Sequence, residues 1–348
     1  MNIPELVNLD SLGPLLSNVM NDQRWLNLDA QLIAGGKSNL TFEISSGAGI
    51  VILRRPPNGK LLPSAHDMPR EARIQRALAS TSIPVAKVLY LDASDGILGF
   101  PFYIMERVDG YVIREELPYG YAELPDEKLA LANTLIDVLA EIHSVDPTSI
   151  GLRDFGKADG YLERQINRWG VQWGKSKTKE VVAIDELSVQ LKRLMPKSSR
   201  SSIVHGDYRL DNCVMSIENT SRMNAVLDWE LSSLGDPMID LALTLFYWRE
   251  PGDHRLTLIP SPTASPGFPS RTHLANRYAS ASGLRLEDLW FYEAFARFKF
   301  AVITQGVLAR VANNAMAGQE FGNLDDEVRV IAEEGLEKIM RKGRTDGL

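Results

Sequence analysis

Cysteine is almost absent from the 348-residue chain, where Cys213 is the only one. A single cysteine excludes an internal disulfide framework and is typical of a reducing compartment. No run approaches the roughly 18 consecutive apolar residues of a membrane helix, and the N-terminus MNIPELVNLDSLG lacks the basic and apolar regions of a secretory signal. Positive charge is also scarce, because 38 Lys and Arg face 45 Asp and Glu. We therefore expect a cytoplasmic protein without a membrane or nucleic-acid partner, and its oligomeric state stays open.

The stretch IAGGKSNLTFEI, residues 33–44, contains Gly-Lys-Ser but lacks the rest of a phosphate-binding P-loop. The pattern Gly-x-x-x-x-Gly-Lys-Ser/Thr requires a glycine at position 31, which is Gln31 here. A P-loop also opens a helix, whereas LTFEI alternates apolar and polar residues and is typical of a strand. What remains is a glycine turn between two strands, as in nucleotide loops of the kinase type.

Residues 1–107 are predicted to form a small, β-rich lobe. A helical lead-in at 4–26 precedes strands within 30–55, and the turn SSGAG separates the last two of these strands. HDMPREARIQRALAS is rich in helix formers and carries a proline near its start, where helices accept it. VAKVLYLD and FPFYIMERV are typical of two further strands.

Residues 108–348 are predicted to form a larger, mostly helical lobe. DEKLALANTLIDVLAEIHSVD and DLWFYEAFARFKFAVITQGVLARVANNAM are apolar at helical spacing. Short strand-like pieces interrupt the helices at SSIVHGD and MNAVLDW. The segment 250–271 holds five prolines, which predicts an ordered loop or a lid and not a helix. The fold class is therefore α+β, with two lobes.

The chemically informative segment is IVHGDYRLDNCVM, followed by NAVLDWELSSLGDPMIDLA. Asp207 and Asn212 lie five positions apart, and Asp228 follows a short apolar strand. Phosphoryl transfer uses this set of groups: a carboxylate that takes the proton of the attacking hydroxyl, and hard oxygen ligands for Mg²⁺. A single Asp or Asn is more often a cap or turn residue, so the joint spacing carries the prediction.

HGDYRLDN and LDWE resemble the catalytic and metal-binding motifs of the aminoglycoside phosphotransferase and choline kinase-like family, which shares the protein-kinase fold. The resemblance runs over nearly the whole chain, and PGFPSR looks like the subgroup related to kinase-like domains fused to some acyl-CoA dehydrogenases. It implies that Asp207 is the catalytic base and that Asn212 and Asp228 bind Mg²⁺. Arg209 stands near the place where protein kinases carry a lysine close to the γ-phosphate.

Five other polar or small residues around these motifs are predicted to be structural. By the resemblance, Asp236 and Asp240 look like positions that cap and tie the following helix. His205 is expected to brace the loop, and Cys213 and His143 are expected to lie in or beside the core.

The same resemblance assigns the glycine turn to nucleotide binding. In a kinase-like fold the hairpin turn over the nucleotide offers backbone N–H groups to the phosphates of ATP or another nucleoside triphosphate. The side chain of the lysine in this turn either touches a phosphate or is a solvated loop lysine. The residues of the predicted turn are Gly35, Gly36, Lys37, Ser38 and Asn39.

The strand after the turn is expected to supply the cation that grips the α- and β-phosphates. IVILRRPP offers Arg54 where the family usually has lysine. Arginine keeps the charge but is planar and bidentate, so either it serves the same purpose or the grip is altered. Glu71 fits the helix glutamate that pairs with this cation, and the backbone near Glu106 and Val108 is expected to hold the adenine.

The acceptor is predicted to be a small molecule with a hydroxyl group. The segment between the first helix of the larger lobe and the catalytic loop usually shapes the acceptor site in this family. Residues 150–200 hold eleven Lys and Arg against six Asp and Glu, which favours an anionic hydroxy acid or a hydroxyacyl thioester. The alternatives are a true aminoglycoside phosphotransferase and a non-catalytic pseudokinase, which the unusual Arg54 keeps open.

Overall fold

The computed structural model of the chain describes residues 6–33, 39–57, 66–198, 200–312 and 322–345. They divide into two compact units. The smaller unit comprises Met1–Gly110, Thr148–Leu152 and Asn224–Ser232, and the larger comprises Tyr111–Pro147, Arg153–Met223 and Ser233–Leu348. The sequence-based division at residues 107 and 108 treats each lobe as one continuous stretch, so it does not include the two later segments of the smaller unit.

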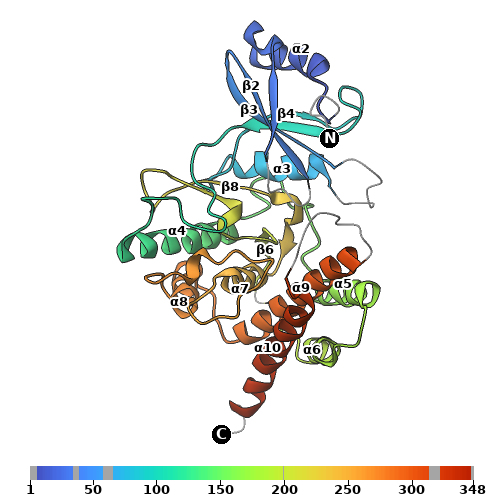
Figure 1. Cartoon of the computed structure of the whole chain (residues 1–348), viewed down its shortest axis with the longest axis vertical. Coiled ribbons are helices and arrows are strands. Elements are labelled where there is room, and N and C mark those ends of the chain that lie inside the picture. Colours follow the sequence, from blue (N-terminus) through green and yellow to red (C-terminus); the bar gives the residue numbers. More distant parts are fainter. Residues whose placement is uncertain (1–5, 34–38, 58–65, 199, 313–321, 346–348) are drawn as a thin grey trace. The chain divides into compact units, whose positions relative to one another are not determined.

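The smaller unit is built on a five-stranded antiparallel sheet in the order β1-β2-β3-β5-β4. Strands β2, β3 and β4 of this sheet are labelled in Figure 1. Its strands alternate buried residues between the two faces of the sheet, as the period of a β-strand requires. The strands are β1 (Asp29–Leu32), β2 (Leu40–Ser46), β3 (Gly49–Arg55), β4 (Val88–Asp92) and β5 (Phe102–Glu106).

A helix covers each face of this sheet. Helix α2 (Leu9–Met20) and the short 3₁₀-helix η1 (Gln23–Leu26) pack on the face that carries Val51 and Leu53 of β3. Helix α3 (Met68–Leu78) packs on the opposite face against Ile52. Arg54 lies two residues after Ile52 and therefore points to the α3 side of the sheet.

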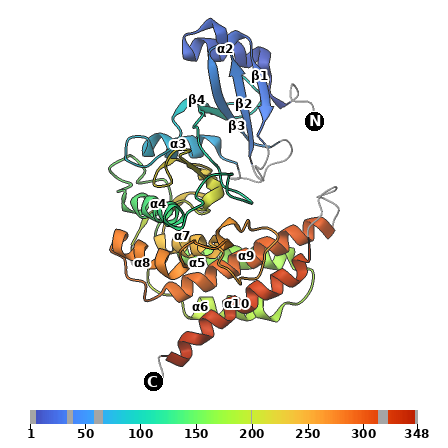
Figure 2. The same cartoon turned by 60° about the vertical axis from the view of Figure 1, so that its left-hand side comes forward.

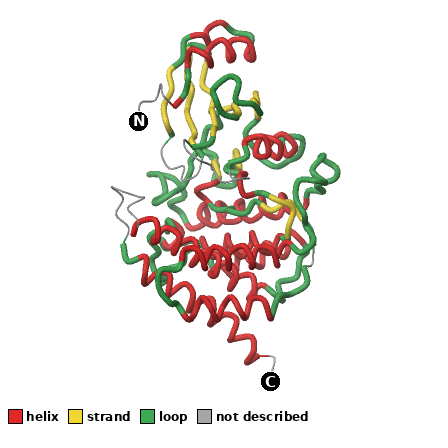
Figure 3. Tube along the Cα trace, turned by 90° about the vertical axis from the view of Figure 1, so that its right-hand side faces the viewer, coloured by secondary structure: helices red, strands yellow, loops and turns green. Residues whose placement is uncertain are grey.

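The larger unit is mostly helical, and long helices drawn in red dominate it in Figure 3. Helices α9 and α10 run side by side in Figure 2, and α5 and α6 pack against them. None of the described helices is long and apolar enough to cross a membrane. The α-helices are α4 (Pro125–Ser144), α5 (Tyr161–Ser176), α6 (Val182–Arg193), α7 (Pro237–Tyr247), α8 (Arg271–Ser282), α9 (Leu289–Ala312) and α10 (Leu324–Thr345).

Helix α7 forms the centre of this unit. Its sequence PMIDLALTLFY is apolar on every side, and almost all of its residues are buried, as expected of a helix surrounded by others. Strands β6 (Ser202–Val204) and β9 (Ser233–Gly235) pair antiparallel, and β9 ends just before α7. The other short elements of this unit are η2 (Leu210–Asn212), β7 (Cys213–Met215) and η4 (Pro262–Ala264), whereas η3 (Trp229–Leu231) and most of β8 (Met223–Val226) belong to the smaller unit.

Candidate active site

The loop that carries Asp207 follows β6 and turns at Gly206. The φ angle of Gly206 is +88°, a left-handed conformation that glycine adopts without strain. The N–H groups of His205 and Gly206 donate to the carboxylate of Asp240, at 2.5 and 2.9 Å. On the other side, the buried Lys299 of α9 donates from Nζ to the Gly206 carbonyl at 2.9 Å. Buried groups of opposite charge therefore fix the backbone immediately before Asp207.

Asp240 lies in the first turn of α7 and is completely buried. Burial would raise the pKa of Asp240, but hydrogen bonding and charge from His143, whose Nε2 lies 3.3 Å away, outweigh burial and lower it. Asp236 caps α7 as predicted, because its side chain accepts a hydrogen bond from the Met238 N–H at 3.0 Å. Asp240 thus links this helix to the loop that carries Asp207.

We predict that Asp240→Asn destabilises the protein by about 2–3 kcal/mol, because an amide cannot accept the charge-assisted hydrogen bonds that the buried carboxylate accepts. Since the folded pKa of Asp240 is lowered, its stabilising contribution is present above the unfolded value of about 4. It is lost as the pH falls through the lower folded value. Denaturant unfolding at pH 6 and at pH 3 measures this.

Asp137→Asn is the control for this prediction, because Asp137 forms a half-exposed ion pair with Arg277 at 2.6 Å. Such pairs contribute about 0–1 kcal/mol. Equal stabilities of the Asp240→Asn variant and wild type at pH 6 would contradict the assignment of Asp240 as the anchor of the loop.

Two neighbours hold the carboxylate of Asp207. The Tyr247 hydroxyl at the end of α7 donates to Asp207 Oδ1 at 2.7 Å, and Asn212 Nδ2 donates to Oδ2 at 3.1 Å. Burial raises the pKa of Tyr247, and the charge of Asp207 raises it further, so the phenol stays a donor. The Asp207 side chain remains about a quarter exposed, at 27%. A fixed, ionisable and accessible carboxylate is the arrangement that a general base requires.

Arg209 lies beside this carboxylate. Its Nε is 3.6 Å from Asp207 Oδ2, and its Nη2 is 2.7 Å from Asp211 Oδ2. The guanidinium also lies over the ring of Tyr247, 5.0 Å from the ring centre. The larger unit therefore brings together three of the predicted residues, which are Asp207, Arg209 and Asn212.

Tyr247 and Lys299 were not predicted from the sequence. Both lie in apolar helical stretches, LTLFYW and ARFKFAV, where spacing indicates only a buried face. A lysine in so apolar a stretch is the one signal that was available. Burial lowers the pKa of Lys299, and the charges of Asp207 and Asp240 oppose this effect.

A small pocket opens beside Arg209 in the larger unit. Its wall includes Tyr247, Arg114 and the proline-rich segment after α7, and none of the residues described within 150–200 lines it. The described residues that line it are Ile113, Arg114, Leu135, Arg209, Leu210, Asp211, Thr244, Tyr247, Trp248, Ile259, Pro260, Pro262 and Thr263.

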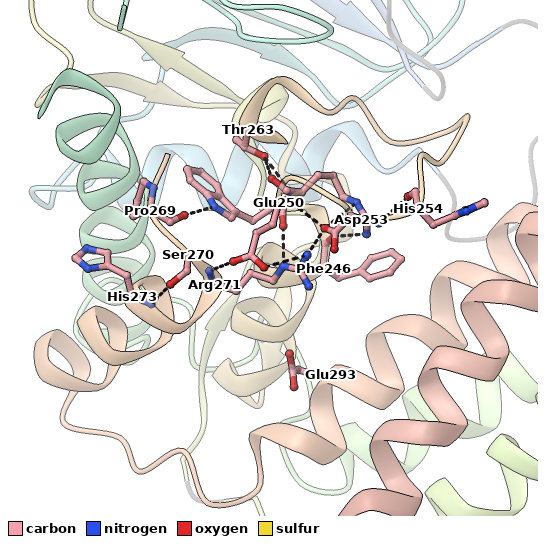
Figure 4. A network of polar contacts seen from close by, with 12 residues as sticks. Phe246, Glu250, Asp253, His254, Thr263, Pro269, Ser270, Arg271, His273 and Glu293 are labelled. Carbon is pink, nitrogen blue, oxygen red and sulfur yellow. Dashed lines mark hydrogen bonds and ion pairs between the residues drawn. The ribbon is translucent and has the colours of Figure 1, made fainter. Parts of the chain in front are cut away.

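The segment predicted at 250–271 forms no α-helix up to Ser270, and α8 begins at its last residue, Arg271. A polar network holds this segment in place (Figure 4). The Thr263 hydroxyl accepts from the Arg249 N–H and donates to the Arg249 carbonyl, both at 2.9 Å. Arg271 pairs with Asp253, and its N–H donates to Glu250 Oε1 at 2.6 Å. Because Thr263 lines the pocket, this network sets the shape of one pocket wall. The segment is thus an ordered loop.

In the smaller unit, Arg54 joins two carboxylates. Its Nε lies 2.8 Å from Glu71 Oε1 on α3, without the alignment of a hydrogen bond, and its Nη2 pairs with Asp228 Oδ1. Glu71 and Arg54 are buried, whereas the Asp228 side chain is 32% exposed. Burial would lower the pKa of Arg54, but Glu71 and Asp228 outweigh burial and raise it. Arg54 therefore stays a cation between two anions.

Asn39 belongs to the same cluster. Its Nδ2 donates to Glu230 Oε2 at 2.9 Å and to Glu71 Oε2 at 3.4 Å, and its Oδ1 lies 2.7 Å from His66 Nδ1. The side chain of Asn39 is thus used inside the smaller unit. The other residues of the predicted nucleotide turn, Gly35, Gly36, Lys37 and Ser38, lie outside the described residues.

Of the two residues predicted to lie near the adenine, Glu106 is the last residue of β5 and Val108 follows two residues later. The Glu106 N–H donates to the Lys87 carbonyl at 3.0 Å, and its carboxylate accepts from the Lys87 N–H at 3.0 Å. Val108 packs against the apolar cluster between β3 and α3. The Glu106 N–H already donates to the Lys87 carbonyl, so a hydrogen bond to adenine here would have to use other backbone groups of this stretch.

The predicted metal ligands carry suitable donor atoms. Asn212 uses its Nδ2 on Asp207, which leaves the amide oxygen as a donor to a cation. Asp228 has a φ of +63° at the start of η3, and a partly exposed carboxylate. Amide and carboxylate oxygens are hard donors of the kind that Mg²⁺ prefers. Asn212 belongs to the larger unit and Asp228 to the smaller one.

A five-stranded lobe with one buried ion pair to its helix, and a helical lobe with an Asp–Asn loop, define a protein-kinase-like fold of the α+β class. The sequence profile described as "Phosphotransferase enzyme family" matches residues 29–259. The chain belongs to this family. The family and the kinase-like fold predicted from the sequence are both confirmed.

Three known proteins show what the chain is similar to. Acyl-CoA dehydrogenase family member 11 of Rattus norvegicus is 37% identical over 313 residues, which are 88% of this chain but only 39% of that protein. The crystal structure of a candidate aminoglycoside phosphotransferase from Ralstonia eutropha is 34% identical, with a TM-score of 0.77 over 90% of this chain and 93% of the other. An aminoglycoside phosphotransferase in complex with ADP and hygromycin B has a TM-score of 0.59 at 17% identity, over 96% and 99%, and shares the fold.

Proposed function

We propose that the chain is an ATP- and Mg²⁺-dependent phosphotransferase that acts on a hydroxyl group of a small molecule. The observation that carries this proposal is the carboxylate of Asp207, which Tyr247 and Asn212 hold at 2.7 and 3.1 Å on an anchored loop. Family membership and the ADP named for a solved relative support a nucleotide as the phosphoryl donor. ATP is the donor to test first, with other nucleoside triphosphates as comparison.

In the proposed reaction Asp207 orients the acceptor hydroxyl and takes its proton as the oxygen attacks the γ-phosphorus. ADP leaves as the bond from the γ-phosphorus to the bridging oxygen breaks. Arg209 offers positive charge beside the transferring group. When Mg²⁺ is bound, it neutralises phosphate charge, and Asn212 and Asp228 are the residues that would hold it.

The nucleotide is proposed to bind through the smaller unit. Arg54, paired with Glu71, grips the α- and β-phosphates, and backbone N–H groups of the glycine turn cover them. The turn residues are Gly35, Gly36, Lys37, Ser38 and Asn39, and the residues proposed near the adenine are Glu106 and Val108.

A screen for acceptor-stimulated ATP turnover tests the proposed class. We expect at least one hydroxy compound to raise ATP consumption and to appear as a phosphate monoester by mass spectrometry. If Mg-ATP raises the melting temperature but no acceptor is phosphorylated, the chain is a non-catalytic nucleotide-binding module instead.

For the acceptor, we propose an anionic hydroxy compound, such as a hydroxy acid or its thioester. Residues 150–200 carry an excess of five positive charges in a chain of net charge −7. Arg114 and Arg209 add two guanidinium groups to the pocket wall near Asp207, with Asp211 as the opposing carboxylate. Anions are steered to such a surface and cations are repelled from it. The relation to acyl-CoA dehydrogenase family members also supports an acyl compound.

A cationic acceptor is the second candidate, because an acidic groove of about 550 Å³ lies in the same unit. Its wall includes Glu115, Glu116 and Glu123, with Lys128 as a cation. Its volume is typical of small-molecule sites. An aminoglycoside, such as the hygromycin B bound by a solved relative, carries the charge that fits this groove.

Charge reversal at neighbouring positions separates the two candidates. For an anionic acceptor we predict that Arg114→Glu raises the acceptor KM by roughly threefold to tenfold and that Glu115→Arg lowers it. A cationic acceptor gives the opposite signs. Both effects should shrink as salt rises, and the KM for ATP should not change.

Arg310→Glu is the matched control for these reversals, because Arg310 is exposed near the end of α9 and lines none of the described pockets. It should leave both KM values unchanged. The pair Arg164→Glu and Arg168→Glu tests the basic segment in the same assay. A KM rise with this pair alone would move the acceptor surface from the Arg114 pocket to α5.

A further inference from the structure

Arg54 forms an ion pair with Asp228, the residue that the proposed function assigns to the metal. Its Nη2 pairs with Asp228 Oδ1, while its Nε lies 2.8 Å from Glu71 Oε1. A planar guanidinium reaches both carboxylates at once, because its donors point along separate edges of the group. Lysine, the usual residue here, ends in a single point charge. The replacement of lysine by arginine thus gives Asp228 a tethered cation.

The Nε contact with Glu71 lacks hydrogen-bond alignment, Nη1 donates to the Thr41 hydroxyl at 3.4 Å, and Nη2 donates to Asp228 Oδ1. The Asp228 side chain is 32% exposed, which leaves it open to solvent and to ions. A carboxylate already paired with a cation has less affinity for a second cation, since both use the same oxygens and the same negative charge.

We propose that Arg54 competes with the divalent cation for Asp228, so that the metal gains this ligand only when nucleotide phosphates draw Arg54 away. The inference rests on the proposed function, since it takes Asp228 as the metal ligand and Arg54 as the phosphate grip. It adds a coupling between the two: nucleotide and metal bind cooperatively, and the nucleotide-free protein holds metal weakly.

The test measures Mn²⁺ binding to the nucleotide-free, full-length chain by electron paramagnetic resonance. The variant Arg54→Met/Glu71→Met removes the inner ion pair as a unit, because replacing a whole buried pair by apolar residues of similar volume is often neutral for stability. It leaves Asp228 without its tethered cation. We expect this variant to bind Mn²⁺ at least about tenfold more tightly than wild type, the size of one charge-assisted hydrogen bond.

Two further variants make the result specific. Adding Asp228→Asn to the double variant should remove the gain, which assigns it to that carboxylate. Arg55→Lys is the matched control: Arg55 is the next residue of β3, donates to the carbonyls of Leu6 and Pro56, and should leave Mn²⁺ binding unchanged. If the double variant does not fold, Arg54→Lys carries the test, with a smaller rise in Mn²⁺ affinity expected.

Equal Mn²⁺ affinity in wild type and in the folded Arg54 variant, without nucleotide, overturns the competition. A gain that persists with Asp228→Asn also overturns it. Failure of the proposed function looks different: a non-hydrolysable ATP analogue with Mg²⁺ then does not bind wild type in calorimetry, whatever the Mn²⁺ result.

Discussion

Asp207→Asn is expected to lower the rate of phosphoryl transfer by about 10²–10⁴-fold, the range typical of general-base catalysis, while Mg-ATP binding stays unchanged. Asparagine keeps the size of the side chain, and its amide oxygen can still accept from the Tyr247 hydroxyl, which lies 2.7 Å from Asp207 Oδ1. It cannot take a proton. The measurements are kcat at saturating ATP and acceptor, and the affinity for a non-hydrolysable ATP analogue by calorimetry.

Tyr247→Phe is the comparison variant, since it removes the donor to Asp207 Oδ1 but leaves the carboxylate. It should lower kcat less than Asp207→Asn does, because the carboxylate that takes the proton is retained. A rate within about twofold of wild type for Asp207→Asn would remove this residue from the role of base.

Much of the fold was predictable from the sequence, because its elements follow simple periods. The two-residue alternation in LTFEI gave β2, and the helical spacing in DEKLALANTLIDVLAEIHSVD and DLWFYEAFARFKFAVITQGVLARVANNAM gave α4 and α9. The pairing order was not available from such patterns. It places β5 between β3 and β4, which depends on contacts between segments far apart in the chain.

The catalytic loop was visible from the sequence, because Asp207 and Asn212 lie close together in it. Their supports were not, because Tyr247 follows Asp207 by 40 residues and Lys299 lies 93 residues from Gly206. The residues that line the pocket near Asp207 could not be predicted from the sequence either. The net charge of residues 150–200 is a property of sequence, but a pocket wall is assembled from several segments, and here Arg114 supplies part of it.

The consequence of having arginine at position 54, where the family usually has lysine, could be judged only from the structure. From the sequence, an arginine in place of lysine leaves two readings open, a retained grip or an altered one. The position of Arg54 on the α3 face of β3 follows from strand period, and its pairing with Glu71 follows from that face. The second pairing, with Asp228, could not be predicted, since 174 residues separate the two.

Asp228→Ala is expected to abolish the Mg²⁺ dependence of nucleotide binding. Loss of an outer partner of a metal ligand already costs about 10–100-fold in affinity, so loss of a charged ligand itself should cost about 100-fold or more. Asn212→Ala should weaken Mg²⁺-dependent binding less, because an amide carries no charge. Calorimetry with a non-hydrolysable ATP analogue, with and without Mg²⁺, measures both effects.

Nucleotide binding by Asp228→Ala in the absence of Mg²⁺ provides a second test. Asp228→Ala also frees Arg54 from one of its two carboxylates, which leaves more of its positive charge for the phosphates. Nucleotide binding without Mg²⁺ should therefore be as tight in this variant as in wild type, or tighter. A general loss of fold would weaken binding in both conditions and lower the melting temperature, which separates it from the loss of a ligand. Equal stimulation by Mg²⁺ in wild type and in Asp228→Ala would place the metal on other residues.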